Sequence, residues 1–218
     1  MPNIKNLQDF LDAYSKEYPP LAIDAILRDF DTDAKYDILM QVKSKLNLLK
    51  EEEDIYQGFI NHLKEEELAR GNILEVGSGF YPILAERLSK IKGTRVTAID
   101  PNLVTTHIPG LKLIRRKFPD AVNVENYDSV VAMMPCDATI SIIRESNKRH
   151  IPFSIMLCQC THFPHPALFE PIYYEKWENY VFECIERTRQ SDSILSEKQL
   201  PDSYQLPFKI ITMKYKNK

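Results

Sequence analysis

The stretch Asn72-Ile-Leu-Glu-Val-Gly-Ser-Gly-Phe-Tyr-Pro-Ile-Leu-Ala-Glu-Arg-Leu88 decides the fold that the sequence predicts. It reads as a buried strand, a glycine-containing turn and an amphipathic helix, in that order. Gly77 and Gly79 carry no Cβ atom, so the backbone of the turn can approach a ligand that lies across the strand end. This arrangement is typical of a nucleotide-binding α/β fold.

A second predicted strand ends in Asp100, directly before Pro101. A carboxylate at this sheet edge can accept hydrogen bonds from both ribose hydroxyls of an adenosine. A glycine turn with a strand-end acid occurs in dinucleotide dehydrogenases and in methyltransferases. The dehydrogenase fingerprint requires a third glycine where this sequence has Pro82, a residue suited instead to the first position of a helix. Dehydrogenase chemistry is therefore disfavoured.

Glu75 lies two positions before the first glycine, where its charge would repel a pyrophosphate and attract the ammonium of a methionine moiety. With this acid, the chain resembles the class I S-adenosylmethionine-dependent methyltransferases. Their first motif reads acid-x-Gly-x-Gly-x-Gly, and their second strand ends in an acid. The matching positions are Glu75, Gly77, Gly79 and Asp100, and Tyr81 replaces the third glycine.

The resemblance implies S-adenosylmethionine as cofactor. Glu75 would hold its methionine part, the turn would face it backbone-first, and Asp100 would take the ribose. The implied cofactor-binding residues are Glu75, Gly77, Ser78, Gly79, Asp100 and Pro101. Asp120, after the third predicted strand, would approach the adenine.

From Asn72 onward, apolar runs of strand length alternate with helical stretches, as in a doubly wound α/β fold. We expect a mostly parallel sheet of about six to seven strands. The expected strands are Ile73–Val76, Val96–Ile99, Leu111–Ile114, Ser129–Met133, Phe153–Leu157 and Phe208–Met213. The expected helices are Pro82–Lys90, Ala138–Arg149 and Tyr174–Arg189. The stretch Asn102–Gly110 is too short and too proline-bounded for a crossover helix.

The N-terminal part repeats apolar residues at helical spacing, as in Leu7, Phe10, Leu11 and Tyr14. The pair Arg70-Gly71 ends its last helix, because a cation suits the last turn and a glycine suits the left-handed position beyond it. We expect a helical segment over residues 1–70 and a Rossmann-like S-adenosylmethionine-binding domain over residues 71–218.

Two residues are candidates for catalysis on the acceptor side. Asp137, after the fourth strand, could be a general base or a polar anchor, or could instead cap the helix that begins at Ala138. His162 and His165 follow the fifth strand and could line an acceptor pocket, where His162 could accept a proton. Methyl transfer in line from a sulfonium depends mainly on positioning, so it does not require a dedicated catalytic residue.

Cysteines near these histidines raise the possibility of a thiolate metal site. Cys136, Cys158 and Cys160 could converge with His162 and His165 over the sheet edge. The spacing Cys-x-Cys-x-His-x-x-His matches no common zinc signature, so we expect no metal.

Composition narrows the possible partners. The net charge of −3 creates no attractive field for phosphate backbones, so a nucleic-acid acceptor would need a local basic patch. Basic residues gather at 115–117, at 148–150 and near the C-terminus, where a shared face would form an anion-binding patch. The sequence shows neither a signal-peptide pattern nor an apolar run of membrane-spanning length, so we expect a cytoplasmic protein without membrane partners.

The sequence therefore predicts a methyltransferase acting on an unidentified acceptor, either rRNA or a small molecule. The helical front and the Gly-x-x-Pro turn resemble the aminoglycoside-resistance methyltransferases of small-subunit rRNA. The alternative is a non-catalytic, methyltransferase-like ligand-binding or interaction protein, favoured by Tyr81 and by the missing crossover helix. The shortened region after the second strand resembles small archaeal proteins with a degenerate methyltransferase-like fold.

Overall fold

The computed structural model describes residues 48–79, 81–103, 107–157, 173–200 and 208–216. The chain forms two compact units, Met1–Asp54 and Ile55–Lys218. The second unit contains the whole described sheet. The predicted division at Gly71 falls inside this unit, and the assignment of residues 1–70 to a helical segment stays a prediction.

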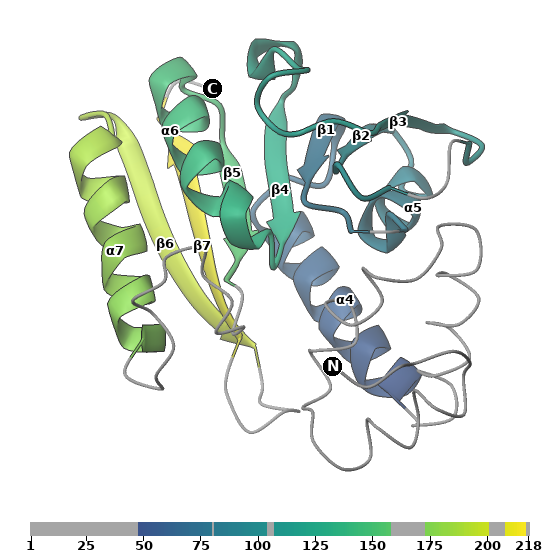
Figure 1. Ribbon diagram of the computed structural model, residues 1–218, viewed down its shortest axis with the longest axis horizontal. Coiled ribbons are helices and arrows are strands. Elements are labelled where there is room, and N and C mark those ends of the chain that lie inside the picture. Colours follow the sequence, from purple (N-terminus) through teal and green to yellow (C-terminus); the bar gives the residue numbers. More distant parts are fainter. Residues whose placement is uncertain (1–47, 80, 104–106, 158–172, 201–207, 217–218) are drawn as a thin grey trace, which may run out of the picture. The chain divides into compact units, whose positions relative to one another are not determined.

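A seven-stranded sheet forms the centre of the second unit, with the strand order β3-β2-β1-β4-β5-β7-β6 (Figure 1). The strands are β1 (Gly71–Val76), β2 (Thr94–Ile99), β3 (Leu111–Ile114), β4 (Ser129–Met133), β5 (Phe153–Met156), β6 (Ser193–Leu200) and β7 (Phe208–Tyr215). Strands β1 to β5 pair in parallel, and β7 is antiparallel to both of its neighbours. The predicted doubly wound, mostly parallel sheet is confirmed. The antiparallel β7 distinguishes it from the all-parallel dinucleotide-binding order 3-2-1-4-5-6.

The helices are α4 (Leu48–Glu65), α5 (Ile83–Ser89), α6 (Thr139–Arg149) and α7 (Tyr173–Thr188), with short 3-10 turns η2 (Val124–Asn126) and η3 (Cys136–Ala138). The last three helices lie within one residue of their predicted bounds. The described residues of Asn102–Gly110 contain no helix, in agreement with the sequence interpretation. No helix in the described ranges is both long enough and apolar enough to cross a membrane.

Strand β6 was not among the predicted strands. It carries Ser193, Ser196, Glu197, Lys198 and Gln199 among its eight residues, so it lacks an apolar run. It is an edge strand, and all eight of its residues pair with β7, which itself has a strongly apolar sequence. Pairing with a neighbouring apolar strand therefore forms this element, and its own pattern gives only a weak signal.

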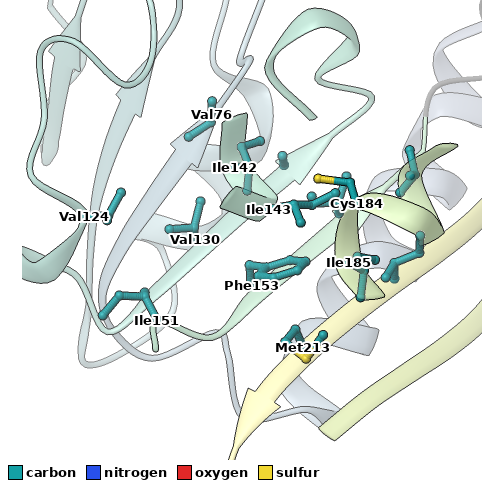
Figure 2. Packing of buried hydrophobic residues seen from close by; sticks show 14 of the residues in the cluster. Val76, Val124, Val130, Ile142, Ile143, Ile151, Phe153, Cys184, Ile185 and Met213 are labelled. Carbon is teal, nitrogen blue, oxygen red and sulfur yellow. The ribbon is translucent and has the colours of Figure 1, made fainter. Parts of the chain in front are cut away.

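Helices cover both faces of the sheet. Because successive side chains of a strand point to opposite faces, Leu74 and Ile73 of β1 enter different apolar clusters. The first cluster packs α6 and α7 on one face, where Ile142, Ile143 and Ile185 meet Phe153 (Figure 2). The second places α5 and the part of α4 from Ile55 onward on the opposite face, with Phe59, Leu63, Leu84 and Leu88 fully buried.

A buried polar chain joins α4 to the sheet. His62 Nε2 lies 2.8 Å from Thr212 Oγ1, which in turn lies 2.8 Å from Ser154 Oγ. Burial lowers the pKa of His62 below its ordinary value. The negative charges of Glu66 and Glu65 oppose this shift, and the positive charges of Lys198 and Lys214 add to it. The neutral imidazole is thus the form that this packing favours.

Candidate functional site

The candidate site lies at the carboxyl ends of β1, β2 and β4. Strand β1 pairs with β2 on one side and with β4 on the other, so the chain direction of the connections reverses at this point. In open α/β sheets, ligands bind in the crevice outside the carboxyl ends of the strands at such a switch point. The loops that follow these three strands are therefore the ones that can form a site.

The turn after β1 requires glycine at its first position. Gly77 has φ +78°, and a Cβ atom added there would lie 2.9 Å from the Cα atom of Pro135. The backbone of the turn thus touches the loop that follows β4. The N–H of Gly77 donates to the carbonyl oxygen of Ile99 at 3.0 Å, and this bond fixes the turn to the end of β2. Only a residue without a side chain fits between these two neighbours.

Gly79 stands in a different environment. It also has a left-handed backbone, with φ +71°, but a Cβ atom added there would meet no atom of the described residues within 4 Å. Its N–H donates to Oδ2 of Asp100 at 3.0 Å, and the N–H of Asn102 donates to Oδ1 at 2.7 Å. Asp100 is 8% exposed, and Pro101 beside it is exposed. The strand-end acid therefore holds the second glycine, and open space lies next to that glycine.

Glu75 is 3% exposed and lies beneath the first turn of α5. Its Oε2 accepts a hydrogen bond from the N–H of Ala85 at 3.2 Å. Burial raises the pKa of Glu75 to about 8, the Ala85 hydrogen bond opposes this rise, and the charge of Asp100 adds to it. The two predicted acids are thus close enough to interact electrostatically. A cation placed nearby would favour the ionised form of Glu75.

Ser78 lies between the two glycines, and its hydroxyl oxygen is buried without a hydrogen-bond partner among the described residues. A buried hydroxyl without a partner is uncommon, because the lost hydration is not replaced. A bound ligand with a polar group at the turn would supply the missing partner. The residues of this turn consequently fit an S-adenosylmethionine molecule, which carries carboxylate, ammonium and hydroxyl groups.

The loop after β4 has an unusual backbone conformation that was not predicted from the sequence. Met134 and Cys136, on either side of Pro135, both have a left-handed backbone, with φ +53° and +44°. Such conformations cost about 1–3 kcal/mol each and cluster at functional sites. The Met-Pro-Cys sequence carries no residue that signals a left-handed turn, so sequence reasoning had no means of finding it.

Asp137 is exposed within η3, which follows this loop. The alternative role as a helix cap is wrong, since no side chain caps η3 or α6, and α6 begins at Thr139 after Ala138. The structure leaves its carboxylate accessible at the edge of the site. Its role in catalysis stays a prediction.

The remaining sequence candidates are Asp120 and the cysteines and histidines after β5. Asp120 is exposed and lines an open pocket after β3 together with Arg116, Lys117 and Ala121. Cys158, Cys160, His162 and His165 lie outside the described residues, so neither their catalytic nor their metal-binding role is tested. Within the described part of the chain, no group of three or more histidine, cysteine or acidic residues could hold a metal ion.

Comparisons with known proteins extend this geometry. No protein-family model matches the sequence, and no curated protein matches it. Solved structures do match. A methyltransferase from Pyrococcus furiosus is 13% identical, with a TM-score of 0.50 over 72% of this chain and 82% of its own. The methyltransferase domain of bacterial CtHen1-CN is 11% identical, with a TM-score of 0.50 over 75% of this chain and 98% of its own.

At this level of identity, the likeness establishes the fold alone. This chain has a seven-stranded, mostly parallel sheet, and its glycine turn and strand-end acid occupy the switch point. The chain has the Rossmann-like fold of the class I S-adenosylmethionine-dependent methyltransferases.

Proposed function

We propose that the chain is a methyltransferase that binds S-adenosylmethionine across Glu75, Gly77, Ser78, Gly79, Asp100 and Pro101. The observation that carries this proposal is the hydrogen bond between the Gly79 N–H and the Asp100 carboxylate. It joins the two sequence motifs at the place where the fold binds ligands. The open space around a Cβ atom added at Gly79, which would meet no described atom within 4 Å, supports the same placement.

Each group has a separate task in the proposed complex. The Asp100 carboxylate accepts from the N–H groups of Gly79 and Asn102, and a carboxylate, which has about four lone-pair sites, would accept from ribose hydroxyls in the complex. The hydroxyl of Ser78 would bond a polar group of the methionine moiety. Glu75, once ionised, would attract the cationic end of the ligand from beneath the turn. S-adenosylmethionine would supply the methyl group from its sulfonium, and its demethylated product, a neutral thioether, would be the leaving group.

On the acceptor side, Asp137 and His162 are the proposed catalytic candidates. Asp137 is exposed beside the strained loop after β4, where it can take a proton from an acceptor. The acceptor is rRNA or a small molecule in this proposal. A cytoplasmic location is part of the same proposal.

Calorimetric titration with S-adenosylmethionine and with its demethylated product tests the proposal. We expect heat with both ligands, and a loss of affinity of about tenfold or more in Asp100→Asn, because a charge-assisted bond to the ribose is weakened. Asparagine retains one oxygen that can accept from the Gly79 N–H and loses the bond from the Asn102 N–H, so thermal unfolding of the variant must show that the fold is retained.

The matched control is Asp128→Asn. Asp128 Oδ2 also accepts a backbone N–H of β1, that of Asn72 at 2.7 Å, but it lies before β4, at the amino ends of the parallel strands. This change removes the same charge and should leave the affinity unaltered. Absence of heat with either ligand would overturn the proposal and favour the non-catalytic interaction protein. Equal affinity losses in both variants would overturn the assignment of Asp100.

A further inference from the structure

Three consecutive basic residues, Arg115, Arg116 and Lys117, follow β3, and all three are exposed. Within the described residues, none of their side chains makes an ion pair or a hydrogen bond. Several other basic side chains here do pair with glutamates, namely Arg70, Lys90, Arg149, Arg187, Arg189, Lys198, Lys209 and Lys214. The run at 115–117 is thus a local positive charge without compensation in an otherwise acidic protein.

The backbone that carries this run is fixed at both ends. Ile114 pairs with Ile99 in the sheet, and Phe118 is 9% exposed within the apolar cluster under α6. Between them, the N–H of Arg116 donates to the carbonyl oxygen of Ile114 at 3.0 Å, which closes a tight turn. The charges therefore stand on a short arch anchored to the core, and less conformational entropy is lost when they bind a ligand.

An open pocket of about 430 Å³ adjoins the arch and is lined by Arg116, Lys117, Asp120 and Ala121. Guanidinium and ammonium groups together are the donors that proteins use for phosphate. Asp120 can accept a hydrogen bond from a hydroxyl, which suits a phosphate attached to a sugar better than inorganic phosphate. The pocket volume lies within the range of small-molecule sites.

We propose that Arg116, Lys117 and Asp120, with Arg115 adding positive charge on the same arch, form a binding site for the phosphate group of a phosphorylated sugar, as in a nucleotide or an RNA strand. The site lies at the same sheet edge as the glycine turn, because the Asp100 N–H donates to the carbonyl oxygen of Ile114 at 3.2 Å, one residue before the arch. Phosphate binding here does not depend on methyl transfer.

Fluorescence anisotropy with a labelled single-stranded RNA of about ten nucleotides tests the site at about 50 and about 200 mM salt. We expect binding that weakens with salt. The double variant Arg116→Ala/Lys117→Ala should lose affinity at least tenfold at the lower salt. The slope of log affinity against log salt should fall by about 1.4, since each phosphate contact on a single strand contributes about 0.7.

The matched control is Arg144→Ala/Lys148→Ala. These residues are exposed on α6, lack ion-pair partners among the described residues, and carry the same charge. This variant should bind within about twofold of the wild type if the 115–117 arch forms the site. Thermal unfolding of both variants checks that the fold is retained, and Asp120→Ala should weaken binding of the nucleotide more than that of inorganic phosphate.

Competition identifies the source of the phosphate. Displacement of the label by adenosine monophosphate supports a free nucleotide as ligand, and displacement by unlabelled RNA alone supports a polynucleotide. Absence of RNA binding and of nucleotide binding at the lower salt overturns the inference, as do equal losses in the two double variants. Titration with S-adenosylmethionine is a separate readout. Heat on titration with S-adenosylmethionine but no phosphate binding would overturn this site and leave the proposed function standing. Phosphate binding without heat from S-adenosylmethionine would overturn the proposed function and leave this site standing.

Discussion

The two halves of the sheet neutralise their carboxylates in different ways. In the β5-β7-β6 half, lysines on the strands pair with glutamates, with Lys198–Glu65 at 2.5 Å and Lys214–Glu66 at 2.7 Å. Lys209 of β7 pairs with both Glu178 and Glu197. In the β2-β1-β4 half, Glu75 is buried with a backbone N–H as its partner, and no lysine or arginine of the described ranges pairs with it. The named glutamates of the first half each have a lysine partner. In the second half, a cationic ligand would stabilise the ionised form of Glu75.

The two halves of the sheet also differ in the regularity of their backbone. Strands β6 and β7 pair over eight residues each without interruption, whereas the short strands β1 and β4 lead into left-handed residues at Gly77, Gly79, Met134 and Cys136. Left-handed backbone and a buried acid without a cationic partner reduce stability, and proteins retain such features where function requires them. We therefore expect the β5-β7-β6 half of the sheet to contribute mainly stability, and ligand binding by the other half is our proposal.

The largest expected effect concerns the two glycines of the turn. Gly77→Ala combines a left-handed backbone with an atom 2.9 Å from the backbone of Pro135, so the loop after β4 must move. We expect a loss of about 3 kcal/mol in the free energy of unfolding, from backbone strain and overpacking together. Gly79→Ala has the same left-handed strain without a clash, so the loss should be about 1–2 kcal/mol.

Urea unfolding of both variants measures this difference, and titration with S-adenosylmethionine gives the second readout. Gly79→Ala should lose affinity out of proportion to its small loss of stability, because its methyl group enters the space left for the ligand. If folded Gly79→Ala binds S-adenosylmethionine with wild-type affinity, the ligand does not occupy the open space next to Gly79.

Glu75→Gln should change stability in the opposite direction. Because burial raises the pKa of Glu75 from 4.5 to about 8, the native protein holds a proton that the unfolded chain releases between these values. The unfolded state thus binds fewer protons, and the wild-type free energy of unfolding falls as pH rises through this window. Glutamine lacks this penalty and can still accept from Ala85. At pH 8, the variant should be about 1 kcal/mol or more stable than the wild type, since each tenfold change in proton affinity corresponds to about 1.4 kcal/mol.

The same substitution should weaken S-adenosylmethionine binding, and the wild-type affinity should rise with pH as Glu75 ionises. Glu86→Gln, on helix α5 that covers Glu75, is the control. The hydrogen bond from Lys90 lowers the pKa of Glu86, so this variant should lose a little stability at pH 7 and keep its affinity. A Glu75→Gln protein that is less stable than the wild type at pH 8 would show that the buried acid is compensated after all.

The difference between the halves also explains what could be predicted from sequence. Apolar runs identify β1, β2, β4, β5 and β7 because both faces of the sheet are covered, and the shorter run Leu111–Ile114 identifies the edge strand β3. The glycine turn with Asp100 identifies the switch point. Edge strand β6 was missed because its pairing depends on β7. The left-handed residues around Pro135 were missed because no local pattern encodes their conformation, and their contact with the glycine turn is visible only in the structure. The burial of Glu75 and its effect on the pKa likewise require the position of α5.

The smallest expected effect concerns the paired half. Lys209 is only 17% exposed, contacts Glu178 and Glu197, and has its ammonium 5.4 Å from the centre of the Phe182 ring. Lys209→Met should reduce the free energy of unfolding by about 1 kcal/mol, because two carboxylates lose their shared cation. The control, Lys90→Met, removes a 69% exposed lysine from a helical pair with Glu86 and should cost about 0.5 kcal/mol or less. Urea unfolding measures both. Neither variant should alter the affinity for S-adenosylmethionine, because their charges compensate acids outside the proposed cofactor site. A Lys209→Met protein that binds the ligand more weakly would therefore mean that the two halves of the sheet are coupled, and that stability and binding cannot be assigned to them separately.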